Sequence, residues 1–232
     1  MQKMVSDITN AGSFAFDTET TSTNPMSADL VGLSFSISQG QGWYIPVGHI
    51  NEDQLALEEV LTAVRPLLES DDLAKSAHNA NFDMLMLRNY GIIPNNVEHD
   101  TMVSAHLLRK TGIGLKNLAL EVLGEDMTTI SSLIGTGKKQ IQMDQVPVTQ
   151  VLEYAAEDAD VPWRLVNTLS ETLAAEELSD LFHKVEMPLV SILAIIDRKS
   201  VVLGKSVDLG GRRTIKKKIR TSTTYQLHLS RH

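Results

Sequence analysis

The stretch F-A-F-D-T-E-T, from Phe14 to Thr20, decides the fold class of this chain. Its two phenylalanines stand at alternate positions, a pattern typical of a buried β-strand. Side chains two residues apart on a strand share a face, so Asp17 and Glu19 point the same way. Neighbouring carboxylates repel each other, and a bound divalent cation, which prefers oxygen ligands, offsets that repulsion. The alternative interpretation is a strand that ends in a polar turn.

Predicted strands and helices alternate along the rest of the chain. Further strands are predicted at 30–37, 43–47 and 73–77, the first two joined as a hairpin through glycines 40 and 42. Helices are predicted at 2–11, 51–70, 79–90, 100–109, 115–123, from 149 past 170, and at 178–197, with residues 128–147 irregular. This order predicts an α/β fold in which helices flank a mixed sheet.

The composition excludes several classes of protein. The 232 residues include no cysteine, so there is neither a disulfide framework nor a thiolate metal site. No apolar run reaches a membrane-spanning length and no signal peptide is visible, so we expect a cytoplasmic protein without a membrane partner. Residues 1–197 hold 11 Lys or Arg against 28 Asp or Glu, which disfavours non-specific binding to nucleic acid by charge alone.

Two later segments carry further carboxylates. In N-A-N-F-D, Asn79 and Asp83 are four residues apart and share a face of the predicted helix. Tyr154 and Asp158 have the same spacing in Y-A-A-E-D-A-D, where small alanines allow another backbone or a substrate to approach closely. Taken singly, each segment also fits a helix start or a solvated acidic face.

Together, D-x-E, N-x-x-x-D and Y-x-x-x-D resemble the three exonuclease motifs of the DEDD superfamily, tyrosine subtype. The stretches D-L-V-G-L-S-F-S-I, Y-I-P-V-G-H and E-M-P-L-V also look like the 3′–5′ proofreading exonuclease domain of bacterial DNA polymerase I, family A. The resemblance covers residues 2–197. It implies an RNase H-like fold, a bacterial source, and a polymerase domain in the full-length protein, which we expect to be a monomer.

The resemblance also implies a mechanism, two-metal-ion hydrolysis of a phosphodiester at the 3′ end of single-stranded DNA. Tyr154 would orient the attacking water, and Thr20 and Asn79 would lie near the terminal nucleotide. Two divalent cations, Mg²⁺ or Mn²⁺, would be bound by four carboxylates: Asp17, Glu19, Asp83 and Asp158. The product would be a nucleoside 5′-monophosphate.

Two other functions stay open on the sequence. One is an RNase D-like 3′–5′ ribonuclease of the same superfamily. The other is a non-catalytic module that holds DNA ends or braces a polymerase, although all four acids and the tyrosine are present.

Several residues depart from the family pattern. His78 stands where the family often has Gln, and we interpret it as a structural histidine at a strand end. Thr23 replaces a frequent Leu, which weakens the apolar wedge expected beside the terminal base. Pro162, inside the long helix predicted from residue 149, predicts a kink near Asp158. The G-T-G-K-K run at 135–139 lacks the residues of a phosphate-binding P-loop, and we expect a basic loop that touches the DNA backbone.

The chain changes character after Asp197. Residues 198–232 hold ten Lys or Arg and one acid, which fits a basic DNA-binding arm. They look more like translated sequencing-adaptor read-through, so we expect no selected function and no fixed structure there. Residues 1–197 are then the exonuclease domain. A strand that the family has ahead of residue 2 is missing, which indicates truncation at that end as well.

Overall fold

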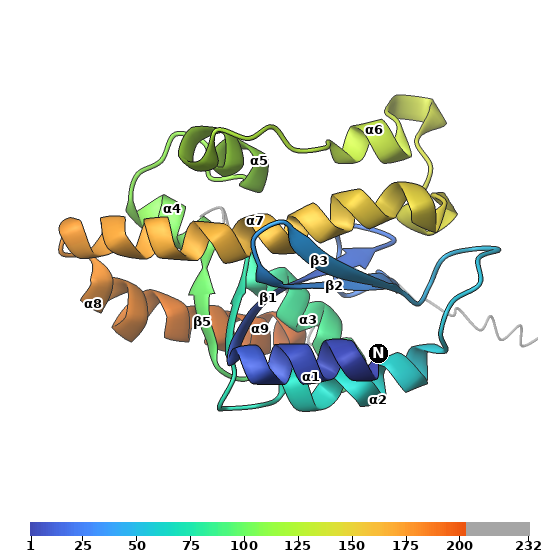
Figure 1. Cartoon of the computed structure of the whole chain (residues 1–232), viewed down its shortest axis with the longest axis horizontal. Coiled ribbons are helices and arrows are strands. Elements are labelled where there is room, and N and C mark those ends of the chain that lie inside the picture. Colours follow the sequence, from blue (N-terminus) through green and yellow to red (C-terminus); the bar gives the residue numbers. More distant parts are fainter. Residues whose placement is uncertain (203–232) are drawn as a thin grey trace, which may run out of the picture.

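A computed structural model describes residues 1–202, with side chains for residues 1–196. Its centre is a five-stranded mixed sheet in the order β3-β2-β1-β4-β5 (Figure 1). The strands are β1 (Ser13–Thr20), β2 (Leu30–Ser38), β3 (Gln41–Pro46), β4 (Ala74–Ala77) and β5 (Val97–Asp100). The strand predicted over 14–20 therefore lies in the middle of the sheet, paired on both sides.

Strand β1 pairs antiparallel with β2 and parallel with β4. In this register Asp17 lies opposite Ser34, and Glu19 lies opposite Gly32. Small residues on β2 therefore stand opposite both carboxylates, and the Tyr44 ring fills the place that a side chain at Gly32 would take. The pairing shifts between Glu19 and Thr20, so the acidic end of β1 leaves the regular ladder.

Helices cover both faces of the sheet. The long helix α7 (Val148–Ala175) crosses one face, and α1 (Gln2–Ala11) and α2 (Leu57–Leu68) lie on the other (Figure 1). The remaining helices are α3 (Ala80–Asn89), α4 (Thr101–Leu107), α5 (Leu115–Leu118), α6 (Ile130–Ile134), α8 (Ser179–Leu181) and α9 (Met187–Val202). Shorter or wider turns are η1 (Ala119–Leu123), η2 (Gly137–Lys139), η3 (Met143–Gln145) and η4 (Phe182–Glu186).

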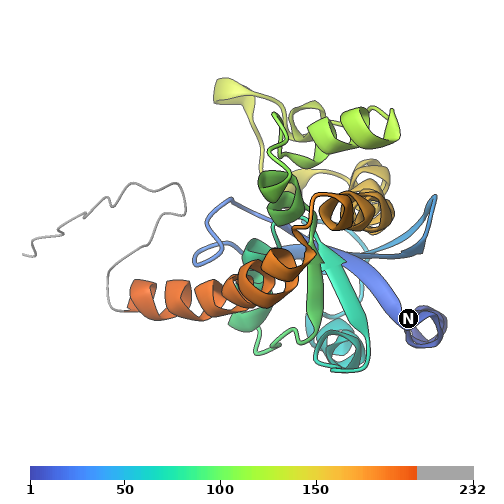
Figure 2. The same cartoon turned by 90° about the vertical axis from the view of Figure 1, so that its left-hand side faces the viewer.

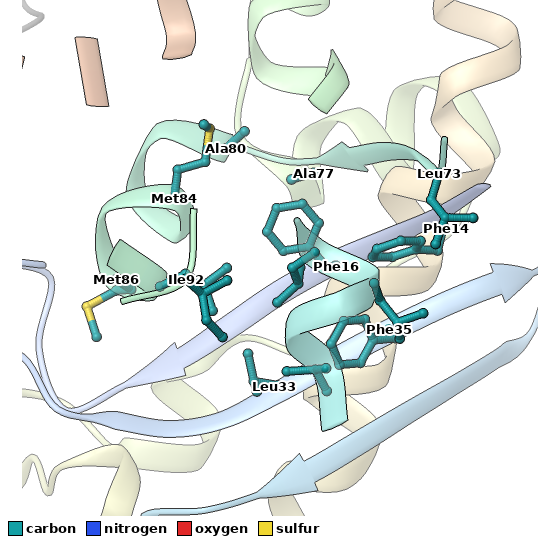
Figure 3. Close-up of a cluster of buried hydrophobic side chains, with 14 of the residues drawn as sticks. Phe14, Phe16, Leu33, Phe35, Leu73, Ala77, Ala80, Met84, Met86 and Ile92 are labelled. Carbon is teal, nitrogen blue, oxygen red and sulfur yellow. The ribbon is translucent and has the colours of Figure 1, made fainter. Parts of the chain in front are cut away.

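The main core lies between the sheet and the helices opposite α7. Phe14 and Phe16 of β1 and Phe35 of β2 are buried there, and the Phe14 and Phe35 ring centroids are 5.9 Å apart (Figure 3). Met84 and Met86 of α3 belong to the same cluster. Alternation along β1 thus sends the phenylalanines into this core and Asp17 and Glu19 to the face covered by α7.

The small residues of α7 let the sheet approach closely, as the sequence predicted. A side chain at Gly42 of β3 would meet Ala156 of α7 at 3.0 Å. Asp160 of the same helix accepts a 2.8 Å hydrogen bond from the Gly40 backbone N–H in the hairpin turn. The helix continues through Pro162 without interruption; the predicted kink stays a prediction.

Three element predictions were wrong. Helix α2 begins at Leu57 rather than near residue 51. The Gln54 side chain accepts a hydrogen bond from the His49 backbone N–H and donates one to the His49 carbonyl, and Asn51 has a left-handed φ of 60°, so this segment forms a turn. Strand β5 was missed, since its four residues pair with β4 alone. The segment 128–147, predicted as irregular, contains α6 and two short 3₁₀ turns.

The C-terminal helical segment extends away from the sheet (Figure 2). Helix α9 runs to Val202, so the first residues of the predicted unstructured tail continue a helix. The rest of that tail, 203–232, lies outside the described residues. Within residues 1–202, every helix is too short or too polar to cross a membrane.

Candidate active site

A cleft of about 660 Å³ opens where β1 ends between α3 and α7. It is lined by all seven residues that the sequence singled out: Asp17, Glu19, Thr20, Asn79, Asp83, Tyr154 and Asp158. These residues come from three segments, 17–20, 79–83 and 154–158, that are more than fifty positions apart in the sequence. The fold therefore places the three motifs around one space.

Three of the carboxylates that line the cleft form a cluster. One oxygen each from Asp17, Glu19 and Asp158 lies within 4.8 Å of the other two. Glu19 is 6% exposed, and its Oε1 has no hydrogen-bond partner among the described residues. An unpartnered buried carboxylate oxygen is costly unless a cation contacts it. The donor set, all carboxylate oxygen, fits a hard divalent ion such as Mg²⁺ or Mn²⁺.

Burial and mutual repulsion disfavour negative charge in this cluster. The pKa of Asp17 is raised well above its ordinary value by burial and by Asp83, Glu19 and Asp158. Burial also raises the pKa of Glu19, with further contributions from Asp158 and Asp83. The pKa of Asp158 is raised to about 6, mainly by burial, although Tyr154 and Lys116 both lower it. The cluster therefore favours binding of positive charge.

Asp83 lies in the same cleft but is not part of the three-carboxylate cluster. Its Oδ1 accepts hydrogen bonds from the backbone N–H of Thr18 at 3.1 Å and from the Thr18 hydroxyl at 2.5 Å. Burial raises the pKa of Asp83 to about 8 against these hydrogen bonds. Thr18, on the opposite face of β1 from the two acids, thus ties α3 to the end of the strand.

Tyr154 stands beside Asp158 on α7. Its hydroxyl hydrogen-bonds the Asp158 carboxylate, and burial raises the pKa of the phenol above its ordinary value. The phenol is therefore a hydrogen-bond donor rather than a base. The Lys116 ammonium of α5 lies over the Tyr154 ring, 5.6 Å from its centroid.

The start of α3 is held by Asp100. Its carboxylate accepts hydrogen bonds from the backbone N–H groups of Asn79 and Ala80, and also from two amides at the start of α4. The sequence predicted a helix from residue 100 onward but not the contact between Asp100 and α3. Asn79 has a left-handed φ of 64°, and its side chain makes no cap hydrogen bond.

His78 was interpreted from the sequence as a structural histidine, and that role stays a prediction. Its Nδ1 lies 2.8 Å from the Thr101 hydroxyl, and burial lowers its pKa to about 4. The ring also lines the cleft, in an uncharged form.

The other wall of the cleft comes from residues 128–147, here called the arm. The arm contributes four apolar side chains, which sequence reasoning missed: Ile130, Ile134, Ile141 and Met143. Ile130 is 44% exposed and Ile141 is 41% exposed. The run 135–139 was correctly excluded as a P-loop; it forms the tip of the arm, with Lys138 and Lys139 exposed. Phe82 and Met102 were also missed as lining residues.

The arm is anchored at both ends. The Thr128 backbone N–H donates to Glu157 of α7 at 3.2 Å, and the Thr128 carbonyl accepts from Lys116. At the other end the His49 ring contacts the Val146 carbonyl through Nδ1 at 2.9 Å. The Glu157 carboxylate of the third motif thus has a structural partner outside the three-carboxylate cluster.

The sequence matches known exonuclease domains. A profile described as "3'-5' exonuclease" matches residues 1–174. The DNA polymerase I of Chloroflexus aurantiacus is 44% identical over 203 residues, covering 86% of this chain and 21% of that protein. The DNA polymerase I of Pseudomonas aeruginosa is 37% identical over 197 residues, covering 82% and 22%. The chain therefore spans about a fifth of the length of these curated relatives.

Solved structures share the fold. Brucella melitensis NrnC with bound Mg²⁺ superposes with a TM-score of 0.67 at 21% identity, covering 88% of this chain and 92% of that chain. This confirms the predicted α/β, RNase H-like sheet flanked by helices. Since the profile covers most of the chain and the DNA polymerase I matches extend over more than four fifths of it, this chain belongs to the 3′–5′ exonuclease domain family of DNA polymerase I.

Proposed function

We propose that this domain removes nucleotides one at a time from the 3′ end of DNA, with two divalent cations as cofactors. One observation carries the proposal: carboxylates from two distant segments meet within 4.8 Å in a cleft, and Glu19 Oε1 is buried there without a partner among the described residues. The family depends on divalent metal ions, which supports the assignment.

Asp17, Glu19 and Asp158 would hold the cations, with Asp83 completing the set from α3. Bound cations at such a site supply an activated water at neutral pH and stabilise the charge on the leaving 3′-oxygen. In the reaction, the water oxygen joins phosphorus and the bond from phosphorus to the 3′-oxygen breaks. The shortened strand keeps a 3′-hydroxyl, and a nucleoside 5′-monophosphate is released.

Tyr154 would orient the water by donating a hydrogen bond. Its hydroxyl already bonds Asp158, so the donor lies beside a proposed metal ligand. The raised pKa of the phenol keeps its proton in place at neutral pH, which suits an orienting group and not a base.

The cleft walls suit a single-stranded 3′ end. The exposed apolar side chains of Ile130 and Ile141 offer surfaces for an unstacked base. Thr20 and Asn79 also line the cleft, where their polar groups would contact the terminal nucleotide. Thr23, also in the lining, adds no apolar wedge, so we assign that role to the arm.

Charge around the cleft explains how an acidic domain would hold DNA. Lys138 and Lys139 stand exposed at the tip of the arm and would contact backbone phosphates. The cations in the cluster would add positive charge at the 3′ end. The polymerase domain expected in the full-length protein would hold the remaining duplex, with one copy of the protein acting alone.

The test follows a 5′-labelled primer with a mismatched 3′ end, and a matched RNA strand, with Mg²⁺, with Mn²⁺ and with chelator. We expect a ladder of shortened DNA, release of nucleoside 5′-monophosphates, slower RNA trimming, and no reaction in chelator. The variant Asp17→Asn should be inactive, whereas Asp29→Asn, at an exposed acid outside the cleft, should match the wild type.

Two outcomes would replace the proposal. Faster trimming of RNA than of DNA would assign the domain as an RNase D-like ribonuclease. Tight binding of DNA ends without nucleotide release in either metal would assign it as a non-catalytic end-holding module.

A further inference from the structure

We propose that Lys116 is a positioning residue that acts through Tyr154, an inference that rests on the proposed function. Lys116 belongs to α5, outside the three motifs, and its ammonium group lies over the Tyr154 ring, 5.6 Å from the ring centroid. A cation over the face of an aromatic ring is attracted by the negative charge density of that face. The ring therefore loses this attraction if it rotates away from its present orientation.

The ammonium group is itself held in place. Lys116 Nζ donates a hydrogen bond to the Thr128 carbonyl, and the Thr128 N–H donates to Glu157 at 3.2 Å. Glu157 lies one turn of α7 from Tyr154, so the lysine head is tied back to the helix that carries the tyrosine. A half-buried lysine anchored in this way keeps one position, unlike a solvated surface lysine.

The hydrogen bond to Asp158 involves only the hydroxyl end of Tyr154, and the other contacts of the ring are apolar. The ring belongs to a small apolar cluster that includes Tyr44, Met143 and Val146. Apolar packing is non-directional, so it buries the ring without selecting one rotation of the phenol. The attraction between the Lys116 ammonium and the face of the ring depends on the orientation of the ring. It therefore favours the orientation that keeps the Tyr154 hydroxyl beside Asp158.

Lys116 is not placed to bind substrate. It is absent from the residues that line the cleft, and one N–H of its ammonium group donates to the Thr128 carbonyl. Its loss should therefore change the rate of the chemical step and leave the Michaelis constant for DNA nearly unchanged.

The experiment compares three single variants, Lys116→Met, Lys116→Arg and Tyr154→Phe. It also includes the double variant that carries both Lys116→Met and Tyr154→Phe. We expect kcat to fall about tenfold in Lys116→Met, with KM for DNA within about twofold of wild type. Lys116→Arg, which keeps the charge and the donor, should recover most of the loss. The charge control Lys184→Met, at an exposed pair with Asp180, should match the wild type.

The double variant tests whether Lys116 acts through Tyr154. If Lys116 acts by placing the Tyr154 hydroxyl, Lys116→Met should add no further loss in the Tyr154→Phe background. An equal tenfold loss in both backgrounds, or a raised KM with unchanged kcat, would overturn the inference. Unchanged activity of Lys116→Met in an active wild type would overturn it as well. A wild-type chain that releases no nucleotide would instead overturn the proposed function.

Discussion

Removal of one charge from the carboxylate cluster should have opposite effects on stability and on activity. Asp17 has Glu19 and Asp158 as neighbours within 4.8 Å, and it is only half-buried, so water can solvate a replacement amide. Asp17→Asn keeps the shape of the side chain and removes its charge. In chelator, we expect the variant to be more stable than the wild type.

The magnitude follows from the geometry. Two unit charges 4.8 Å apart repel by about 3 kcal/mol at an effective dielectric constant of about 20. The raised pKa values of these acids mean that the wild-type cluster already relieves part of this repulsion by binding protons. The net gain for the variant should therefore be about 1–2 kcal/mol, or about 2–8 °C in Tm for a domain of this size.

Metal ions should reverse the order of stability of the wild type and Asp17→Asn. A cation present at a hundred times its dissociation constant stabilises the protein that binds it by about 2.7 kcal/mol, and the variant has lost a ligand. Wild type should then be the more stable protein in Mg²⁺, while nucleotide release by Asp17→Asn falls by several orders of magnitude.

The assay is thermal unfolding of wild type, Asp17→Asn and the exposed control Asp29→Asn, each in chelator and in Mg²⁺, alongside nucleotide release. A lower Tm for Asp17→Asn in chelator would show that the cluster is not under repulsion. An equal rise in Tm with Mg²⁺ for wild type and Asp17→Asn would show that Asp17 is not a ligand. Either result would refute the reasoning.

Three further predictions concern the stability of the protein around the site. Asp100→Ala should lower the free energy of unfolding by about 3 kcal/mol, because amides of α3 and α4 lose a buried acceptor; urea titration measures the loss, and faster exchange of the Ala80 amide would locate it. Gly32→Ala should lower the free energy of unfolding by about 2–3 kcal/mol in the same titration, because the new Cβ would lie 2.3 Å from the Tyr44 ring. The control Gly114→Ala, whose new Cβ would meet no atom within 4 Å, should lower it by less than about 0.5 kcal/mol. Burial lowers the pKa of His99 to about 4, below the ordinary 6.5, so the unfolded chain takes up this proton first as pH falls. The contribution of His99 is complete above about pH 6.5 and should fall by about 2 kcal/mol between pH 7 and pH 5; an identical pH dependence in His99→Gln would contradict this.

The amino-acid sequence alone determined the elements that carry the motifs. Alternating aromatic and acidic residues predicted β1, and helical spacing put Asn79 with Asp83 and Tyr154 with Asp158. These predictions depend on short-range periodicity, which the local backbone imposes whatever the rest of the chain does. The order of the three motifs then sufficed to identify the fold class by resemblance.

Only the tertiary structure decided how these elements meet. Strand β5 has four residues and exists through parallel pairing with β4, a contact that local pattern does not encode. The arm has no periodicity of its own, so its role as a cleft wall depends on anchors at Thr128 and Val146. Lys116 stands outside every motif, and its place over the Tyr154 ring results from the packing of α5 against α7. Contacts between residues far apart in the chain depend on complementary surfaces, and a single sequence does not state which surfaces will face each other.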